Sequence, residues 1–340
     1  MYRFALAGCG RISKNHIEAL KEFPEASLVA CCDVEEDRAR AVAEAAGCPA
    51  FTRYEEMLES VPCDIVSICT PSGLHPEHVV QAAERGMHTL CEKPLGTSLA
   101  EVDRAIAACD RNKTKLFVVK QNRFNRTVDL LRRALEKGRF GRIYMVLSNV
   151  LWTRPQDYYD MAKWRGTWEF DGGCLSNQAA HYVDLVQWMG GAVESVQAYS
   201  ATQGRRIEAE DSIVVNLRFR SGALGSISVT TLAYPKNLEG SLTVLGERGT
   251  VKIGGFALNS FERWEFDSPD PMDDEVHQAD TAPPNVYGFG HRAYYRHVLD
   301  VLQGKEPLRV DGRDGRKTVE IIQAAYASVR NGGAPSPLPL

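Results

Sequence analysis

The sequence contains no long apolar run. No stretch approaches the roughly 20 consecutive apolar residues that a membrane helix needs, so we expect no membrane partner. The apolar residues among positions 1–7 are too few for the core of a secretion signal. A block of basic residues is also missing and the formal net charge is −4, which argues against a nucleic-acid partner.

Cysteines in disulfide or redox spacing are missing too. None of the nine cysteines forms a C-x-x-C pair, none follows Cys174, and several fall in segments that we expect to be buried strands. This usage argues against a disulfide framework and favours a reducing compartment, so we expect a cytoplasmic protein. Internal repeats and low-complexity tracts are also absent, which excludes a repeat architecture.

The length and the apolar content predict two domains. The chain has 340 residues and is 44% hydrophobic, whereas a single core rarely grows beyond about 250–300 residues. Up to residue 121, short apolar runs alternate with amphipathic stretches, which predicts a doubly wound parallel sheet of the Rossmann type. Strands are expected at 4–7, 27–32, 64–69, 88–91 and 116–120, and helices at 15–23, 36–46, 55–59, 76–85 and 99–112.

A different pattern covers residues 122–340, our second expected domain. In 211–219 the apolar residues alternate with polar ones, as in a half-buried antiparallel strand. Glycine turns around Gly222 and in 246–249 predict two hairpins. We therefore expect an α+β domain with an open, mainly antiparallel sheet and helices on one face. Helices are expected at 128–137, 291–302 and 317–329, and an acidic surface loop at 267–284.

The first glycine-rich turn has the features of a dinucleotide site. Gly8 and Gly10 follow the first strand and lead into the first helix, where backbone N–H groups can hold a pyrophosphate. Asp33 follows the second strand and can accept both hydroxyls of a ribose, which favours NAD over NADP. Asp33 can instead cap the helix that begins beside it. Arg38 is positioned to accommodate a 2′-phosphate, which keeps NADP open.

Two further segments offer groups for oxidation of a hydroxyl. Lys93 follows the fourth strand, at the sheet edge where doubly wound folds bind ligands, but a surface lysine beside a turn proline has the same pattern. Gly172 and Gly173 precede a predicted helix in which Asn177 and His181, four residues apart, would share a face. Histidine can accept the hydroxyl proton near neutral pH, although an isolated histidine on a helix is more often structural.

With these motifs, the sequence resembles the Gfo/Idh/MocA oxidoreductase family over essentially its whole length. The resemblance implies an NAD cofactor, Lys93 and His181 as the catalytic pair, and a homodimer or homotetramer formed through the antiparallel sheet. Many members carry Asp where this chain has Asn177. The resemblance rests on residues 8–12, Asp33, Thr70, Pro71, residues 92–94, Gly172, Gly173, Asn177, His181 and residues 310–317.

The resemblance also implies further contacts. It implies cofactor contacts from Gly8, Gly10, Arg11, Ile12, Asp33, Arg38, Thr70, Pro71, His75, Glu92, Lys93, Gln121 and Arg165. It implies substrate contacts from Lys93, Asn122, Arg123, Arg154, Tyr159, Arg165, Asn177, His181 and His291. His291 can equally be a helix cap. His75 and His78 suggest a metal site, but no further ligands with suitable spacing are evident, so we expect none.

Residues 120–125, 154–159 and 164–168 resemble one branch of that family, the UDP-N-acetyl-2-amino-2-deoxyglucuronate 3-dehydrogenases of bacterial surface-polysaccharide synthesis. This likeness implies a UDP-sugar substrate whose anionic groups meet Arg123, Arg154 and Arg165 through forked donors. It also implies that 2-oxoglutarate can reoxidise the cofactor. Tyr158, Tyr159 and Trp164 could line a sugar or base face. The alternatives are a solvated role for the arginines and core packing for these three aromatic residues.

Two alternatives to this function stay open. The first is an enzyme of the same family that acts on myo-inositol, a free sugar or another nucleotide sugar, because fold does not determine substrate. The second is a sugar sensor that binds NAD(P) without catalysis. The presence of both Lys93 and His181 argues against a sensor.

Overall fold

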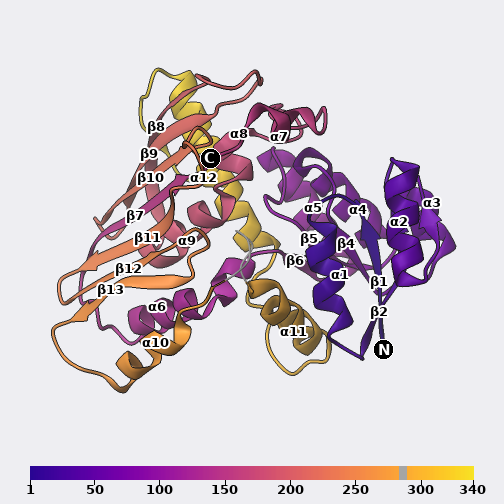
Figure 1. Cartoon of the computed structure of the whole chain (residues 1–340), viewed down its shortest axis with the longest axis horizontal. Coiled ribbons are helices and arrows are strands. Elements are labelled where there is room, and N and C mark those ends of the chain that lie inside the picture. The colour runs from indigo at the N-terminus through magenta and orange to yellow at the C-terminus, as the bar shows by residue number, and fades with distance from the viewer. Residues whose placement is uncertain (283–288) are drawn as a thin grey trace. The chain divides into compact units, whose positions relative to one another are not determined.

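The computed structural model describes residues 1–282 and 289–340 (Figure 1). The chain forms two compact units. The N-terminal unit contains residues 1–120 and 291–316, and the C-terminal unit contains residues 121–290 and 317–340. The sequence assigned residues 291–316 to the second domain, whereas they pack with the first.

The N-terminal unit contains the expected parallel sheet. Its strand order is β3-β2-β1-β4-β5-β6, and every neighbouring pair is parallel, which is a doubly wound arrangement. All residues of β4 and β6 are buried, as expected where both faces of a sheet are covered. The strands are β1 (Tyr2–Ala7), β2 (Ala26–Cys32), β3 (Ala50–Phe51), β4 (Ile65–Ile68), β5 (His88–Cys91) and β6 (Leu116–Val118).

The helices of this unit begin and end close to the expected residues. Gly47 ends α2 with a φ of 69° and donates its N–H to the carbonyl of Ala43, as a helix-ending glycine does. All nine cysteines of the chain are free thiols, in agreement with the sequence. The helices are α1 (Ser13–Lys21), α2 (Glu36–Ala46), α3 (Tyr54–Ser60), α4 (His75–Glu84), α5 (Leu99–Asn112) and α11 (Gly290–Leu302), with a 3-10 turn η1 (Ser72–Leu74).

Buried aromatic residues of α11 explain why the segment 291–316 joins the N-terminal unit. The ring of Tyr295 lies 5.9 Å from that of Phe4, on the first strand. The Tyr294 hydroxyl donates a hydrogen bond to the carbonyl of Val118, on the last strand. The apolar pattern of residues 291–302 predicted a helix, but it carried no information about which sheet that helix covers.

The C-terminal unit contains an eight-stranded sheet of order β13-β12-β11-β7-β10-β9-β8-β14. Among the strands that the structure describes in this sheet, only β7 and β10 are parallel neighbours, so the expected open and mainly antiparallel sheet is confirmed. The β9–β10 and β11–β12 hairpins are confirmed as well. The strands are β7 (Ile143–Leu151), β8 (Val193–Ala201), β9 (Ser212–Phe219), β10 (Leu224–Thr230), β11 (Glu239–Gly246), β12 (Gly249–Gly254), β13 (Ser260–Phe266) and β14 (Ser336–Pro337).

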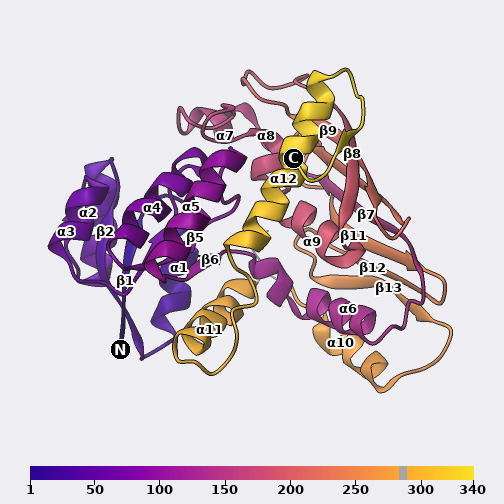
Figure 2. The same ribbon diagram turned by 180° about the vertical axis from the view of Figure 1, so that it is seen from behind.

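One face of this sheet is covered by helices, as Figures 1 and 2 show for α6, α9 and α12. The helix α9 is almost entirely buried and packs on β7, β10 and β11. The other helical segments are η2 (Gln121–Phe124), α6 (Arg126–Glu136), α7 (Gln156–Asp160), α8 (Gly173–Asn177), α9 (Ala180–Gly190), η3 (Pro271–Glu275), α10 (Val276–Ala279) and α12 (Gly312–Arg330).

Two local expectations in this unit were wrong. The predicted loop 267–284 contains η3 and α10, because Asp270 and Asp273 cap η3 reciprocally and Met272 and Ala279 are buried. Its last two residues lie outside the described residues. The glycine turn leads into two helices instead of one, because Ala179 (φ −100°, ψ 2°) interrupts the helix between α8 and α9.

Among the described residues, no helix has the length and apolar character needed to cross a membrane.

Candidate active site

The glycine loop after β1 is tightly fitted at one glycine and open at the other. Gly8 has a φ of 92°, and a Cβ there would lie 2.5 Å from the carbonyl oxygen of Cys69, after β4. Only glycine fits this approach of two strand ends. A Cβ at Gly10 would have no described atom within 4 Å. The loop therefore leaves space over the start of α1, beside Arg11 and Ile12, where a pyrophosphate could lie.

The Asp33 carboxylate joins two backbone segments at this edge of the sheet. Oδ2 accepts a hydrogen bond of 2.8 Å from the N–H of Cys9, in the glycine loop. Oδ1 accepts one of 2.9 Å from the N–H of Glu35 at the start of α2, so Asp33 also supports that helix. Each oxygen can still accept a ribose hydroxyl. Arg38, one turn further along, is exposed.

His75 joins the segments after β4 and β5. Its Nε2 lies 2.7 Å from the carbonyl oxygen of Thr70, and its Nδ1 lies 2.7 Å from that of Pro94. Burial lowers the pKa of His75 and brings that of the neighbouring His78 to about 4. The Nδ1 of His78 lies 3.0 Å from the Thr70 hydroxyl, and Pro71 separates Thr70 from η1. These two histidines therefore hold the backbone around Thr70. That they bind no metal stays a prediction.

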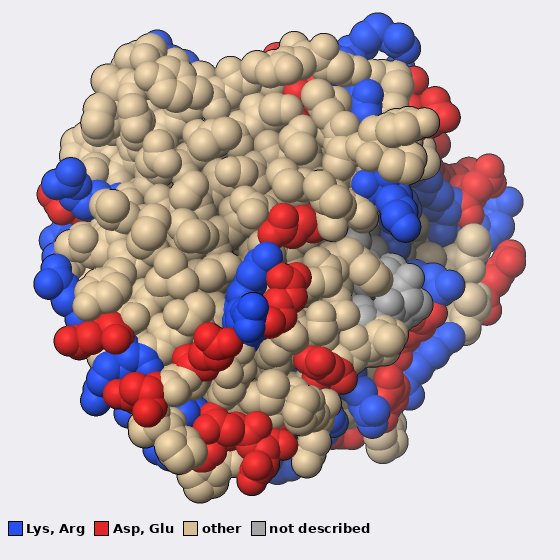
Figure 3. Space-filling view, turned by 60° about the vertical axis from the view of Figure 1, so that its left-hand side comes forward, with Lys and Arg blue, Asp and Glu red and all other residues tan. Residues whose placement is uncertain are grey.

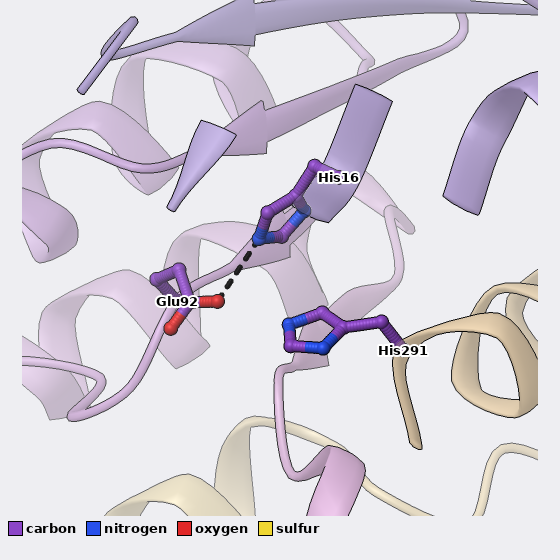
Figure 4. A group of neighbouring side chains, drawn as sticks. All are labelled: His16, Glu92 and His291. Carbon is purple, nitrogen blue, oxygen red and sulfur yellow. Dashed lines mark hydrogen bonds and ion pairs between the residues drawn. The ribbon is translucent and has the colours of Figure 1, made fainter. Parts of the chain in front are cut away.

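Glu92 and Lys93 follow β5, and Glu92 is buried against α1. The Oε1 of Glu92 lies 2.9 Å from the Nε2 of His16 (Figure 4). The Oε2 of Glu92 accepts the N–H of Lys93 at 3.1 Å. Burial alone would raise the pKa of Glu92. The hydrogen bond from His16 and the charge of Lys93 outweigh this effect of burial and lower the pKa to about 2. Glu92 is therefore a buried anion beside a partly exposed lysine.

His291 completes a buried cluster with His16 and Glu92. The two imidazole rings meet edge-on with their centroids 5.6 Å apart. Burial lowers the pKa of His291 to about 4, so its ring is neutral. The three residues offer ligand atoms that all lie within 4.8 Å of one another, a grouping that could hold a metal ion. The ligand atoms of His16 and Glu92, however, already bond to each other.

In the C-terminal unit, Glu210 and Tyr326 hold the glycine turn before α8. The Oε1 of Glu210 accepts hydrogen bonds of 2.9 Å from the N–H of Leu175 and the hydroxyl of Tyr326. The Tyr326 hydroxyl also contacts the carbonyl oxygen of Gly172. A Cβ at Gly173 would lie 1.8 Å from the Oε2 of Glu210, so this position needs glycine. Burial raises the pKa of Glu210 to about 7.

Asn177 and His181 lie on different helices, Asn177 in α8 and His181 in the first turn of α9. The premise that they share one helix face was therefore wrong. The Asn177 amide donates to Oδ1 of Asp171, whose Oδ2 accepts the N–H of Gly166 at 2.7 Å. His181 is buried, with 9% of its surface exposed.

Arg123 has a structural partner. Its guanidinium donates two hydrogen bonds, of 2.7 and 2.6 Å, to the carboxylate of Asp184 in α9, and both residues are buried. The ring of Trp188 lies 4.7 Å from the guanidinium. Gln121 and Asn122 beside it are also buried. The structure thus favours a role for Arg123 in packing α9, and its contact with substrate stays a prediction.

Arginines and aromatic rings alternate between β7 and the glycine turn. The guanidiniums of Arg154 and Arg165 lie 5.5 and 4.3 Å from the ring centre of Tyr158, and Arg165 also lies 4.6 Å from that of Trp164. We call these four residues the arginine–aromatic cluster. Tyr159 is buried with its hydroxyl 3.2 Å from that of Thr231, in agreement with the core-packing alternative.

Comparison with known proteins identifies the family. The description "Oxidoreductase family, NAD-binding Rossmann fold" matches residues 2–120, and "Oxidoreductase family, C-terminal alpha/beta domain" matches residues 132–339. The chain belongs to the Gfo/Idh/MocA oxidoreductase family. Its cofactor is NAD, for which the open space at Gly10 and the carboxylate of Asp33 are suited. It is an NAD-dependent dehydrogenase.

Individual relatives differ in their substrates. The WlbA dehydrogenase from Bordetella pertussis, solved with NADH and UDP-GlcNAcA, is 50% identical, with 100% of this chain and 98% of that chain covered and a TM-score of 0.97. The WlbA dehydrogenase from Chromobacterium violaceum, solved with the same ligands, is 49% identical, with 100% and 96% covered and a TM-score of 0.95. The myo-inositol 2-dehydrogenase from Thermotoga maritima is 31% identical, with 96% of each chain covered.

Sequence reasoning missed the residues that support these motifs. His16 and Tyr295 are 279 positions apart, and Glu210 lies 37 positions after Gly173. The available indication was a charged residue in an otherwise apolar stretch, as Asp184 is within residues 182–186. Such a residue predicts a buried partner, but it does not identify that partner.

Proposed function

We propose that the chain oxidises the C3 hydroxyl of UDP-N-acetylglucosaminuronate to the 3-keto sugar, a step in bacterial surface-polysaccharide synthesis. The observation that carries this proposal is the full-length identity of 49–50% to two dehydrogenases solved with NADH and UDP-GlcNAcA. The curated relatives that act on other polyols reach at most 31% among those compared.

The arginine–aromatic cluster supports an anionic, ring-containing substrate. Arg154 and Arg165 offer forked donors that suit a pyrophosphate or a carboxylate. The rings of Tyr158 and Trp164 hold these guanidiniums in place and offer flat surfaces for a sugar or a base. A free polyol such as myo-inositol has no anionic group that would need this cluster.

In this proposal His181 removes the proton from the C3 hydroxyl, and Lys93 donates a hydrogen bond to the same oxygen as the carbonyl forms. NAD, when bound, accepts the hydride. The remaining roles are proposed as the resemblance implies them. Asn122, Arg123, Tyr159, Asn177 and His291 would serve the substrate, Arg165 both ligands, and Arg11, Ile12, Arg38, Thr70, Pro71, His75, Glu92 and Gln121 the cofactor.

A second candidate is a myo-inositol or free-sugar dehydrogenase. The 31% identity to the Thermotoga maritima enzyme over 96% of both chains favours it. A sensor without catalytic activity is a weaker candidate, because the chain retains both Lys93 and His181.

The test is a single-turnover reaction that follows nicotinamide fluorescence. The enzyme with NAD is mixed with UDP-N-acetylglucosaminuronate, UDP-glucuronate or myo-inositol, and 2-oxoglutarate is added at the end. We expect reduction by the N-acetylated uronate. Later loss of the signal would support reoxidation by 2-oxoglutarate. A folded, NAD-binding enzyme that this uronate does not reduce contradicts the proposal, and reduction by myo-inositol alone would favour the second candidate.

We also propose that the chain acts in the cytoplasm as a homodimer or homotetramer, formed through the sheet face opposite α9. In Figure 3, the side on which Figure 1 draws the strands of the eight-stranded sheet comes forward, and much of it carries no charged side chains. Val214 and Leu224 are each 49% exposed, and Tyr199 is 62% exposed. Apolar patches of this kind on a protein surface are typical of interaction sites.

A further inference from the structure

A continuous chain of hydrogen bonds leads from the interior of the N-terminal unit to Lys93. The Ser67 hydroxyl lies 3.3 Å from the Tyr295 hydroxyl, which lies 2.9 Å from the Nδ1 of His16. The Nε2 of His16 lies 2.9 Å from Oε1 of Glu92 (Figure 4), and Oε2 of Glu92 accepts the backbone N–H of Lys93, which the figure does not draw. These residues come from β4, α11, α1 and the end of β5.

The chemistry of these groups determines the direction of each bond. An ionised carboxylate only accepts hydrogen bonds, so Nε2 of His16 carries a hydrogen and donates to Glu92. In a neutral imidazole the other nitrogen then accepts, so Tyr295 donates to Nδ1 and can accept from Ser67. When the imidazole is neutral, one arrangement of hydrogens therefore satisfies every bond of this chain.

The donor from His16 allows Glu92 to remain charged in the interior. A buried carboxylate is costly unless its oxygens are hydrogen-bonded, and here each oxygen has a donor. The position of Glu92 immediately before Lys93 means that its negative charge favours the ammonium form of that lysine.

We propose that His16 is a positioning residue, which keeps Glu92 an oriented anion and thereby holds Lys93 in place as an ammonium group. This inference rests on the proposed role of Lys93. No metal is needed at the cluster of His16, Glu92 and His291, because Nε2 of His16 and Oε1 of Glu92 already bond to each other. Among the described residues, the titratable groups near Glu92 include His16 from α1, His291 and Tyr295 from α11, His75 from α4, Cys91 at the end of β5, and Cys69 and Lys93 after β4 and β5.

The test measures the reactivity of the Lys93 amine and does not require a substrate. Acetic anhydride labels the unprotonated amine, and peptide mass spectrometry gives the labelling of Lys93 relative to that of the exposed Lys113 at pH 6.5 and pH 9. The variants are His16→Leu, which removes the donor, His16→Gln, which retains an N–H, and Glu92→Gln, which removes the charge. Glu18→Leu, at an exposed position of the same helix, is the matched control.

At pH 6.5 we expect Glu92→Gln to raise the relative labelling of Lys93 about 3- to 10-fold, since an opposite charge nearby commonly shifts a pKa by at least half a unit. His16→Leu should raise it similarly, because without its donor the buried Glu92 takes up a proton near neutral pH. At pH 9 His16→Leu should return to the wild-type value as Glu92 ionises, whereas Glu92→Gln should not. His16→Gln and Glu18→Leu should match the wild type.

A folded His16→Leu protein with wild-type labelling at both pH values overturns the inference. If that variant does not fold, wild-type labelling of Glu92→Gln at pH 6.5 overturns it. The same proteins are then assayed for NAD affinity and for turnover of UDP-N-acetylglucosaminuronate. Loss of turnover in His16→Leu with unchanged NAD affinity, restored in His16→Gln, supports a positioning role. A wild type that does not use this substrate but shows the labelling pattern contradicts only the proposed function.

Discussion

Lys93 and His181 are the two side chains on which the proposed chemistry depends. Lys93→Met removes the donor to the reacting oxygen, and His181→Asn removes the base. General acid–base groups typically contribute about 10²- to 10⁴-fold, so we expect kcat to fall by that order in each variant while the fold is retained. Steady-state formation of NADH and urea unfolding measure these two effects. Near-normal turnover in either variant would remove that residue from the mechanism, and Lys113→Met is the control for loss of an exposed lysine.

The pair of Arg123 and Asp184 tests whether a residue predicted to bind substrate is structural. Arg123→Met leaves the carboxylate of Asp184 buried without the guanidinium that donates two hydrogen bonds to it. Breaking a buried pair in this way costs about 3–5 kcal/mol in the free energy of unfolding. The exposed pair of Arg40 and Glu36 is the control, and Arg40→Met should leave the free energy of unfolding nearly unchanged. Urea denaturation measures both variants. If Arg123→Met and Arg40→Met lost the same free energy of unfolding, the structural role of Arg123 would be contradicted.

At the scale of an element, the glycine loop between β1 and α1 needs glycine for two different reasons: close packing at Gly8 and space for the cofactor at Gly10. Gly8→Ala places a Cβ against Cys69 at a positive φ, so we expect a loss of about 2–5 kcal/mol. Gly47→Ala, also at positive φ but with no described atom within 4 Å of the added Cβ, should cost only about 1–2 kcal/mol.

Gly10→Ala should leave the stability nearly unchanged and weaken NAD binding, because its Cβ enters space that the protein leaves open. Thermal unfolding and titration with NAD separate the two requirements. Unchanged NAD affinity in a folded Gly10→Ala protein would exclude the loop as the pyrophosphate site.

The glycine turn before α8 predicts a pH dependence of stability. The folded pKa of Glu210 is about 7, above the value of 4.5 for an unperturbed carboxyl. The folded state therefore holds the proton more tightly than the unfolded state does. The stability that this provides is complete below about pH 4.5 and is lost as the pH rises through 7, by up to about 3 kcal/mol.

Glu210→Gln cannot ionise, so we expect it to be more stable than the wild type at pH 8 and similar to it at pH 5. Urea denaturation at the two pH values measures the difference. Glu194→Gln, at an exposed position of β8, should show no such difference. If the difference in the free energy of unfolding between Glu210→Gln and the wild type were the same at pH 5 and pH 8, a buried carboxyl that titrates near neutrality would be contradicted.

At the scale of the whole molecule, the open face of the eight-stranded sheet predicts self-association. A charge placed at the centre of an apolar interface must be desolvated without a partner, which opposes association. Leu224→Glu or Val214→Glu should therefore convert the dimer or tetramer to a monomer, as measured by size-exclusion chromatography with light scattering. Val34→Glu, at a position 85% exposed in the N-terminal unit, should not. A monomeric wild type would contradict the prediction directly.

The sequence alone determined the elements whose signals are local. The period-2 pattern of 211–219 and the glycine turns predicted strands and hairpins, because side-chain alternation and turn chemistry depend on residues that are close in the sequence. The glycine loop with Asp33 predicted the cofactor site for a similar reason, since the carboxyl ends of successive parallel strands meet at one edge of the sheet.

Only the tertiary structure decided how distant residues are combined. It brought Tyr295 to His16, Asp184 to Arg123 and Glu210 to Gly173, and it packed residues 291–316 with the N-terminal sheet. A buried charge requires a partner, and that partner can lie anywhere in the chain. The neighbouring sequence therefore shows that a partner is required, but it does not show which residue the partner is. Packing of strands and helices that are far apart in the chain selects that partner.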